Sequence, residues 1–312
     1  MADVTHHAPG ANFIGAGDRY GIKQSTPVTF LADAATAAVP AQFADQCYVD
    51  RILHEGGAVR GVLARIVGAN GVNEYQLVVR APIVVVSCGS LNSPALLLRS
   101  GLPNANGQIG KNLRLHPVAG LGGIMPQDAP EVAMWRGAPM TTVSNVVAAG
   151  PTGDGYGAKI EVPLAHPGVA TSAVPYVSGY GFKDSFLNYP RLVPLIVLTR
   201  DKGSGEVRID KTGAPRLYYP LSDHDRKSMM DGLDKAARIV AAAGCERLLS
   251  GQFRDLQDLP RDGPAREAAL EKIIAEMRRV GFPDFKVPMF SAHQMGTCKM
   301  GSDPMTSVVK PT

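Results

Sequence analysis

The chain has 312 residues, enough for one large or two moderate domains, each with its own hydrophobic core. Hydrophobic residues make up 45% of the sequence and charged residues 19%, a composition typical of folded globular proteins rather than disordered ones. Lys and Arg number 32 against 28 Asp and Glu, and the basic residues are scattered along the chain. This charge pattern argues against a nucleic-acid-binding protein.

The four cysteines, Cys47, Cys88, Cys245 and Cys298, stand far apart and form no CxxC pair. They indicate reduced thiols in a cytoplasmic compartment rather than a disulfide scaffold or a zinc site. The adjacent His6 and His7 are expected to be solvent-exposed, so no metal site is predicted. No apolar run is long enough to cross a membrane, and no signal peptide is visible. We therefore expect a cytoplasmic location without a transmembrane segment, and peripheral membrane contact stays open.

Short elements are predicted before residue 81. The GxGxxxG spacing of residues 15–21 differs from the dinucleotide-binding GxGxxG, and no convincing strand precedes it, so we expect a loop. Thr26 is predicted to cap a helix that runs to about residue 38, with Pro27 in its first turn. A β-meander is predicted next from three extended segments separated by Gly56-Gly57 and Asn70-Gly71: residues 46–54, 59–67 and 73–80.

The stretch from residue 81 to 101 combines a short apolar run with small residues and a helical pattern. Residues 83–86 are β-branched throughout, which predicts a strand buried on both faces of a parallel sheet. A sharp turn over residues 87–90 is expected to lead into a helix with Ser93 as N-cap and Pro94 at its first position, ending at Gly101. Such a turn at a helix N-terminus favours anions. An ordinary strand–helix unit of a protein core is the alternative interpretation.

The later part of the chain predicts an antiparallel sheet backed by helices. Ser222 is expected to cap a long helix that ends before Gly244. Met229 and Met230 on this helix are either core residues or part of an apolar substrate path, and the core is the commoner case. The other predicted elements are strands at residues 156–163 and 192–200, a hairpin at 206–210 and 215–219, and a helix at 266–280.

Two motifs resemble those of one enzyme family. The first consists of Gly89-Ser90, Ser93-Pro94, Leu97-Leu98 and Ser100-Gly101-Leu102. The second is the run from His293 to Gly301, with the sequence HQMGTCKMG, followed by Asp303-Pro304. Together, and in this order, they resemble the glucose–methanol–choline (GMC) flavoprotein oxidoreductases, although Pro103 stands where the first signature ends in Gly. Residues 21–26, 113–117 and 291–295 are most similar to the long-chain alcohol oxidase branch.

The resemblance implies an α/β (α+β) fold with FAD as cofactor. It implies a partial, Rossmann-like FAD-binding domain at residues 1–114, a substrate-binding domain at 115–288, and a return to the FAD domain at 289–312. His293 is the implied base, which removes the hydroxyl proton of a primary, long-chain and hence apolar alcohol while the flavin accepts the hydride, giving an aldehyde. The implied cofactor-binding residues are Val49, Ser87, Cys88, Gly89, Ser90, Gly296 and Thr297.

The sequence also departs from the family pattern. It contains no GxGxxG unit with its ribose-binding acid and no segment with a second catalytic His or Asn, and Lys310 replaces an Asp common after the paired valines. These departures lead to an alternative expectation, a truncated, non-catalytic fragment that binds FAD weakly or not at all. In that case the apolar residues 83–86 should be left exposed. A nicotinamide-dependent dehydrogenase is the rival enzyme class and would need a complete Rossmann fingerprint.

Overall fold

The computed structural model describes residues 24–310, except 69–70, 133–139, 141, 164–166, 171–175, 177 and 254. His6, His7, the loop predicted at residues 15–21 and Asn70 lie outside the described residues. The chain divides into two compact units. Unit 1 contains His116–Lys202 and Leu221–Ala292; unit 2 contains Gln24–Leu115, Gly203–Pro220 and His293–Thr312. Residues 203–220, inside the stretch predicted as the substrate-binding domain, therefore pack with unit 2.

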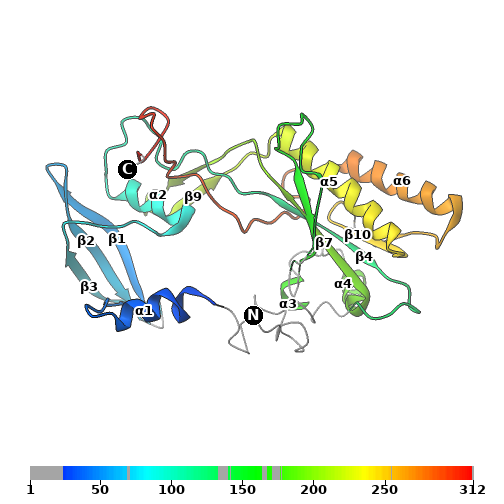
Figure 1. Cartoon of the computed structure of the whole chain (residues 1–312), viewed down its shortest axis with the longest axis horizontal. Helices are drawn as coiled ribbons and strands as arrows, with labels where there is room; N and C mark the ends of the chain where they lie inside the picture. Colours follow the sequence, from blue (N-terminus) through cyan, green and yellow to red (C-terminus); the bar gives the residue numbers. More distant parts are fainter. Residues whose placement is uncertain are drawn as a thin grey trace. The chain divides into compact units, whose positions relative to one another are not determined.

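The predicted β-meander of unit 2 is confirmed. Strands β1 (Cys47–Glu55), β2 (Ala58–Val67) and β3 (Asn73–Arg80) form an antiparallel sheet in the order β1-β2-β3 (Figure 1). Gly56 and Gly57 make the first turn with φ angles of 57° and 80°, a backbone conformation that other residues adopt only with strain.

The helix predicted from Thr26 is shorter and interrupted. A 3₁₀ turn, η1 (Thr26–Val28), precedes the short helix α1 (Phe30–Thr36). Thr29 separates them with a φ of −125° and a ψ of −101°, which no helix accommodates. Its hydroxyl donates to the carbonyl of Ser25 over 3.1 Å, so a threonine side chain stabilises the break.

The strand predicted at residues 83–86 is wrong: these residues are extended without strand pairing, and Ile83 and Val85 are 77% and 82% exposed. A strand needs a neighbour to exchange hydrogen bonds with, and no described strand runs beside this segment. The predicted helix start is also wrong, because α2 (Gly89–Arg99) begins four residues before Ser93 and contains Pro94 in its interior. The predicted stop is confirmed, since Gly101 has a φ of 68° just beyond the helix.

The predicted hairpin forms and packs on the rest of unit 2. It consists of β8 (Glu206–Ile209) and β9 (Pro215–Tyr218), and both strands contact α2, which also contacts β1. Asp210 closes the turn, because its carboxylate accepts from the backbone N–H groups of Thr212 (2.8 Å) and Ala214 (3.1 Å) and from the Thr212 hydroxyl (2.6 Å).

Unit 1 contains the predicted antiparallel sheet, in the order β11-β10-β4-β7-β6-β5. Its strands are β4 (Val118–Ile124), β5 (Val143–Val147), β6 (Ala158–Glu161), β7 (Leu192–Thr199), β10 (Arg247–Ser250) and β11 (Gln257–Asp258). Sequence patterning missed β4, which has three glycines in seven residues. A Cβ at Gly123 would overlap Val240 and Cys245, so glycine lets a helix approach the strand closely.

Helices complete the core of unit 1. α5 (Asp223–Ala242) packs on β4, β6 and β7, and α6 (Gly263–Val280) packs on α5 (Figure 1). The predicted cap is confirmed, because the Ser222 hydroxyl oxygen accepts from the N–H of Asp225 over 3.1 Å. The remaining helical segments are α3 (Pro167–Ala170), α4 (Gly179–Leu187) and the 3₁₀ turn η2 (Tyr189–Arg191). In the part of the chain that the structure describes, no helix is long and apolar enough to span a bilayer.

Candidate functional site

All of the predicted site residues lie in unit 2. Val49 is on β1, residues 87–88 lead into α2, and residues 89–90 are the first two residues of this helix. Residues 293–297 belong to the segment with which the chain re-enters this unit. Ser87, Cys88 and Gly89 are exposed, and Cys88 is the N-cap residue of α2. Gly89 has a φ of 77°, and nothing lies within 4 Å of where its Cβ would stand. The backbone at the start of α2 is therefore open to an approaching group.

A hydrogen bond joins the two sequence motifs. In an α-helix the N–H of residue 94 would donate to the carbonyl of residue 90, but Pro94 has no N–H. The hydroxyl of Thr297 donates to this carbonyl of Ser90 instead, over 2.6 Å. Thr297 is only 1% exposed, so the bond is shielded from water. Pro94 of the first motif thus leaves the Ser90 carbonyl without a helical donor, and the hydroxyl of Thr297 in the second motif donates to it.

A second hydrogen bond runs in the opposite direction. The Ser90 hydroxyl donates to the carbonyl of Gln294 over 2.8 Å, next to His293. The N–H of Gly110 donates to the carbonyl of Thr297 over 2.9 Å, which fixes the same segment to a neighbouring loop. Two stretches about 200 residues apart in sequence are therefore held together at Ser90.

The close approach at Gly296 explains the glycine of the second motif. Gly296 has a φ of 93°, and a Cβ there would overlap the carbonyl oxygen of Asn112. Its neighbour Met295 exchanges two backbone hydrogen bonds of 2.9 Å with Arg114. Packing against residues 112–114 thus requires glycine at this position. The sequence indicated Arg114 only as part of the family-like residues 113–117 and did not single out Asn112, because their contacts with this segment depend on long-range pairing.

His293 and Cys298 differ in their surroundings. His293 is exposed, on the segment that the Ser90 hydrogen bonds hold in place. Cys298 is half-buried, and burial raises the pKa of its thiol. The His293 side chain is therefore accessible for chemistry, whereas burial favours the neutral form of the Cys298 thiol.

Val49 lies apart from the other predicted residues. Its carbonyl accepts from Nη2 of Arg99 over 2.8 Å, and Nε of Arg99 donates to the carbonyl of Asp50 over 2.6 Å. Arg99 is the last residue of α2, nine residues after Ser90, so Val49 is held near the opposite end of this helix, about 14 Å along its axis. Sequence reasoning missed Arg99, because nothing local indicates that it anchors β1.

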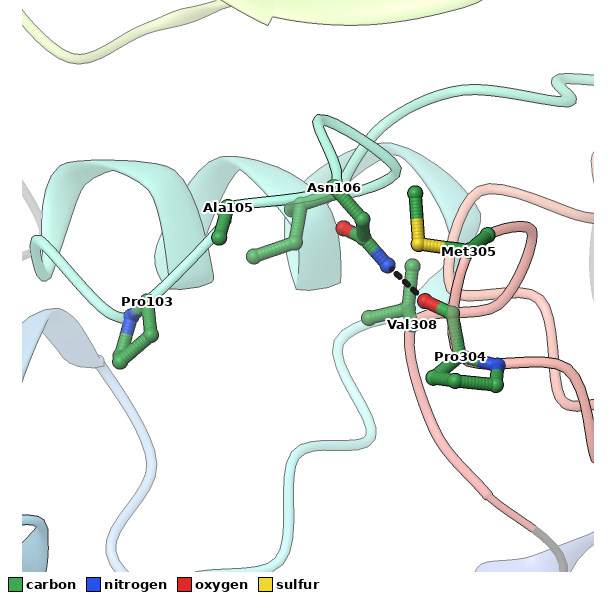
Figure 2. Close-up of a pocket in the computed structure, with 7 residues that line it drawn as sticks. Pro103, Ala105, Asn106, Pro304, Met305 and Val308 are labelled. Carbon is green, nitrogen blue, oxygen red and sulfur yellow. Dashed lines mark hydrogen bonds between the residues drawn. The ribbon is translucent and has the colours of Figure 1, made fainter.

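A cavity of about 400 Å³ lies elsewhere in unit 2 (Figure 2). Pro103, Ala105 and Asn106 line it on one side, and Pro304, Met305 and Val308 on the other. The Asn106 amide nitrogen donates to the carbonyls of Pro304 (2.7 Å) and Ser307 (2.8 Å), which ties the two loops together. None of the predicted site residues lines this cavity.

The residues weighed as parts of a substrate path belong to the core. Met229 and Met230 are 0% and 6% exposed within the hydrophobic cluster of unit 1. His116 and His224 have structural partners in unit 1. Nδ1 of His116 lies 2.8 Å from Oδ1 of the buried Asp201, and Nε2 of His224 lies 2.8 Å from the carbonyl of Tyr156. His166 lies outside the described residues.

Comparisons with known proteins point to one family. Two family models, both described as GMC oxidoreductase, match residues 3–118 and residues 201–312, which together make up more than half of the chain. A solved FAD-dependent oxidoreductase from Chaetomium thermophilum is 16% identical with a TM-score of 0.48, covering 86% of this chain and 54% of its own.

Curated relatives agree with these models. The long-chain-alcohol oxidase FAO4A of Arabidopsis thaliana is 32% identical over 100% of this chain and 43% of its own length. FAO4B of the same plant is 34% identical over 92% of this chain and 38% of its own. The chain thus spans about two fifths of the length of these relatives. The two motifs joined at Ser90 and the two matching models place the chain in the GMC oxidoreductase family.

Proposed function

We propose that this chain serves the FAD-dependent oxidation of a primary, long-chain alcohol to an aldehyde, with His293 as the base. GMC oxidoreductases bind FAD, and the relatives named above are long-chain-alcohol oxidases. The observation that carries the proposal is the pair of hydrogen bonds at Ser90, which hold the open turn before α2 and the segment of His293 together in unit 2.

The residues around the turn fit one side of a dinucleotide cofactor. The first N–H groups of a helix have no partners within the helix and attract anions such as phosphate. At α2 these groups follow the exposed residues Ser87, Cys88 and Gly89, and the space around Gly89 is open. Residues 87–90 would therefore hold the phosphate side of FAD. When bound, FAD supplies the hydride acceptor that no side chain can provide.

His293 would provide the proton chemistry. An alcohol loses its hydroxyl proton as the hydride leaves the carbon, and imidazole is well suited to accept a proton near neutral pH. The exposed position of His293, next to the anchored Gln294, supports access by substrate and a fixed backbone for the ring. A long alkyl chain would add affinity by up to about 0.8 kcal/mol per buried methylene. Turnover efficiency should therefore rise with the length of the alcohol.

The test is to assay the protein, supplied with FAD, on primary alcohols from ethanol to dodecanol. His293→Ala should lower the rate of the chemical step by about 10²–10⁴-fold. His54→Ala is the matched control, since His54 is another exposed histidine of unit 2 and should leave the rate unchanged. A normal rate for His293→Ala would remove it from the role of base. Turnover that needs NAD and no flavin, or a flat dependence on chain length, would contradict the proposed reaction or substrate.

A further inference from the structure

His293 and Met295 lie on the same face of an extended backbone. The N–H and carbonyl groups of Met295 point towards Arg114, since these two residues exchange two backbone hydrogen bonds of 2.9 Å. The carbonyl of Gln294 points the other way, where it accepts from the Ser90 hydroxyl over 2.8 Å. This alternation of backbone groups is typical of a β-strand, in which side chains two residues apart project from one face. The side chain of Met295 therefore stands beside that of His293.

Met295 brings a large apolar surface to this face, because its side chain is 50% exposed. Arg114 lies directly opposite Met295, but Nη1 of its guanidinium donates to the carbonyl of Gly203. Gly205, two residues further on, lies on the other side of this strand from Met295, since it exchanges two backbone hydrogen bonds with Leu113. The guanidinium is thus tethered away from Met295, whose thioether is left open to an approaching molecule.

We propose that Met295 is a specificity-determining residue that holds the alkyl chain of the alcohol beside the base. This inference rests on the proposed function, in which His293 faces the hydroxyl group of the substrate. A side chain on the same face meets the part of the substrate next to that group. Two residues of a strand span about 7 Å, so the thioether would contact the alkyl chain a few carbons from the hydroxyl. Methionine is flexible and polarisable and forms only weak hydrogen bonds, which favours an alkyl chain over a polar one.

The segment is anchored without the Met295 side chain. The two hydrogen bonds with Arg114 involve backbone groups alone, so they do not depend on which side chain stands at position 295. Thr297, two residues later, is only 1% exposed and uses its side chain to bind Ser90, whereas half of Met295 stays exposed. A substitution at Met295 should therefore leave the segment in place. Its effect on turnover would then report the contact with substrate.

The kinetic experiment compares ethanol with 1-hexanol as substrates of the 312-residue chain supplied with FAD. Met295→Ser should lower kcat/KM for 1-hexanol by about tenfold more than for ethanol, because the lost contact covers about two methylenes. Met295→Leu keeps an apolar side chain of similar size and should retain the preference for 1-hexanol. Met305→Ser is the matched control, since Met305 is 68% exposed in unit 2 and should leave the preference unchanged.

A binding measurement separates this inference from the proposed reaction. In the chain labelled with methionine that carries ¹³C in its methyl group, 1-hexanol should shift the NMR signal of Met295, which Met295→Leu identifies by its loss. A Met295 shift in a chain that oxidises no alcohol would contradict the proposed reaction but support the contact with the alkyl chain.

Three results would overturn the role of Met295. The first is a Met295 signal that 1-hexanol leaves unmoved, and the second is an equal shift of all exposed methionine signals, which indicates non-specific binding. The third is an equal fall in kcat/KM for ethanol and 1-hexanol in Met295→Ser, which would mean that the side chain supports the base or the flavin rather than the alkyl chain.

Discussion

The hydroxyl of Thr297 donates a 2.6 Å hydrogen bond to the carbonyl of Ser90, the one helical acceptor that Pro94 leaves without its backbone donor. Thr297 and Pro94 do not need to touch for this relation to hold. Pro94 removes the backbone donor of this carbonyl and Thr297 replaces it, which matters because a buried carbonyl without a donor costs free energy.

We predict that Thr297→Val destabilises the protein by about 1–3 kcal/mol, because it keeps the shape of the side chain and leaves the Ser90 carbonyl without a donor. Chemical denaturation, followed by circular dichroism, measures the free energy of unfolding. Thr297→Ser keeps the hydroxyl, so its free energy of unfolding should fall much less than that of Thr297→Val. Equal losses in the Val and Ser variants would show that the methyl group matters and the hydrogen bond does not.

A double-mutant cycle tests the part of Pro94. Pro94→Ala restores a backbone N–H at position 94, which can donate to Ser90 within the helix. Thr297→Val should therefore cost less in the Pro94→Ala background than in the wild-type chain, with a coupling free energy of about 0.5–3 kcal/mol. Additive losses would mean that the two residues act independently.

Gly296→Ala should destabilise unit 2 by more than about 2 kcal/mol. The alanine would have to adopt a positive φ and would also overlap the carbonyl of Asn112. Gly107→Ala separates the cost of the positive φ from the cost of the overlap, since Gly107 has a φ of 65° but open space around its Cβ position. This variant should lower the free energy of unfolding by only about 1–2 kcal/mol. Thermal unfolding of both variants gives the comparison, and equal losses would exclude the overlap as a cause.

The Asp210 carboxyl should titrate well below its usual range. Hydrogen bonds from the hydroxyl and N–H of Thr212 lower the pKa of this carboxyl from 3.8 to about 2. Because the folded state holds the charged form, the stabilisation is complete above the unfolded pKa and is lost as the pH falls from about 4 towards 2. A carboxyl carbon NMR titration measures the pKa directly.

Unfolding between pH 2 and 7 checks the same carboxyl. Asp210→Asn should remove part of the acid sensitivity, and Asp45→Asn, at an exposed carboxyl of the same unit, is the control. An Asp210 pKa near 4 would contradict the hydrogen-bonded turn.

The cysteines should differ sharply in reactivity. Burial raises the pKa of the Cys245 thiol to about 11, and its side chain is 0% exposed, so the thiolate needed for alkylation is absent at pH 8. Cys88 is exposed at the start of α2. Iodoacetamide at pH 8, followed by peptide mass spectrometry, should modify Cys88 in the folded protein and Cys245 only after denaturation. Equal modification of both would show that the core around Cys245 opens.

Local sequence determined those elements whose signals are contained in neighbouring residues. The paired glycines at 56–57 adopt the positive φ that a tight turn requires, and Ser222 caps α5 with an N–H three residues away. The Asp210 turn likewise needs only residues 210–214. The two motifs also identified the family, because their residue spacing is a property of the sequence.

Tertiary structure decided the elements that need distant partners. Residues 83–86 have the composition of a strand but do not form one, since no described strand lies beside them to share hydrogen bonds. The glycines of β4 gave no strand signal in the sequence. Only the packing shows why glycine is needed at Gly123, because a Cβ there would overlap Val240 and Cys245. Pro94 lies inside α2, and the hydroxyl of Thr297, about 200 residues later, donates to the Ser90 carbonyl that Pro94 leaves without its backbone donor. No local pattern contains that hydrogen bond, because it exists only after the chain has brought both residues together.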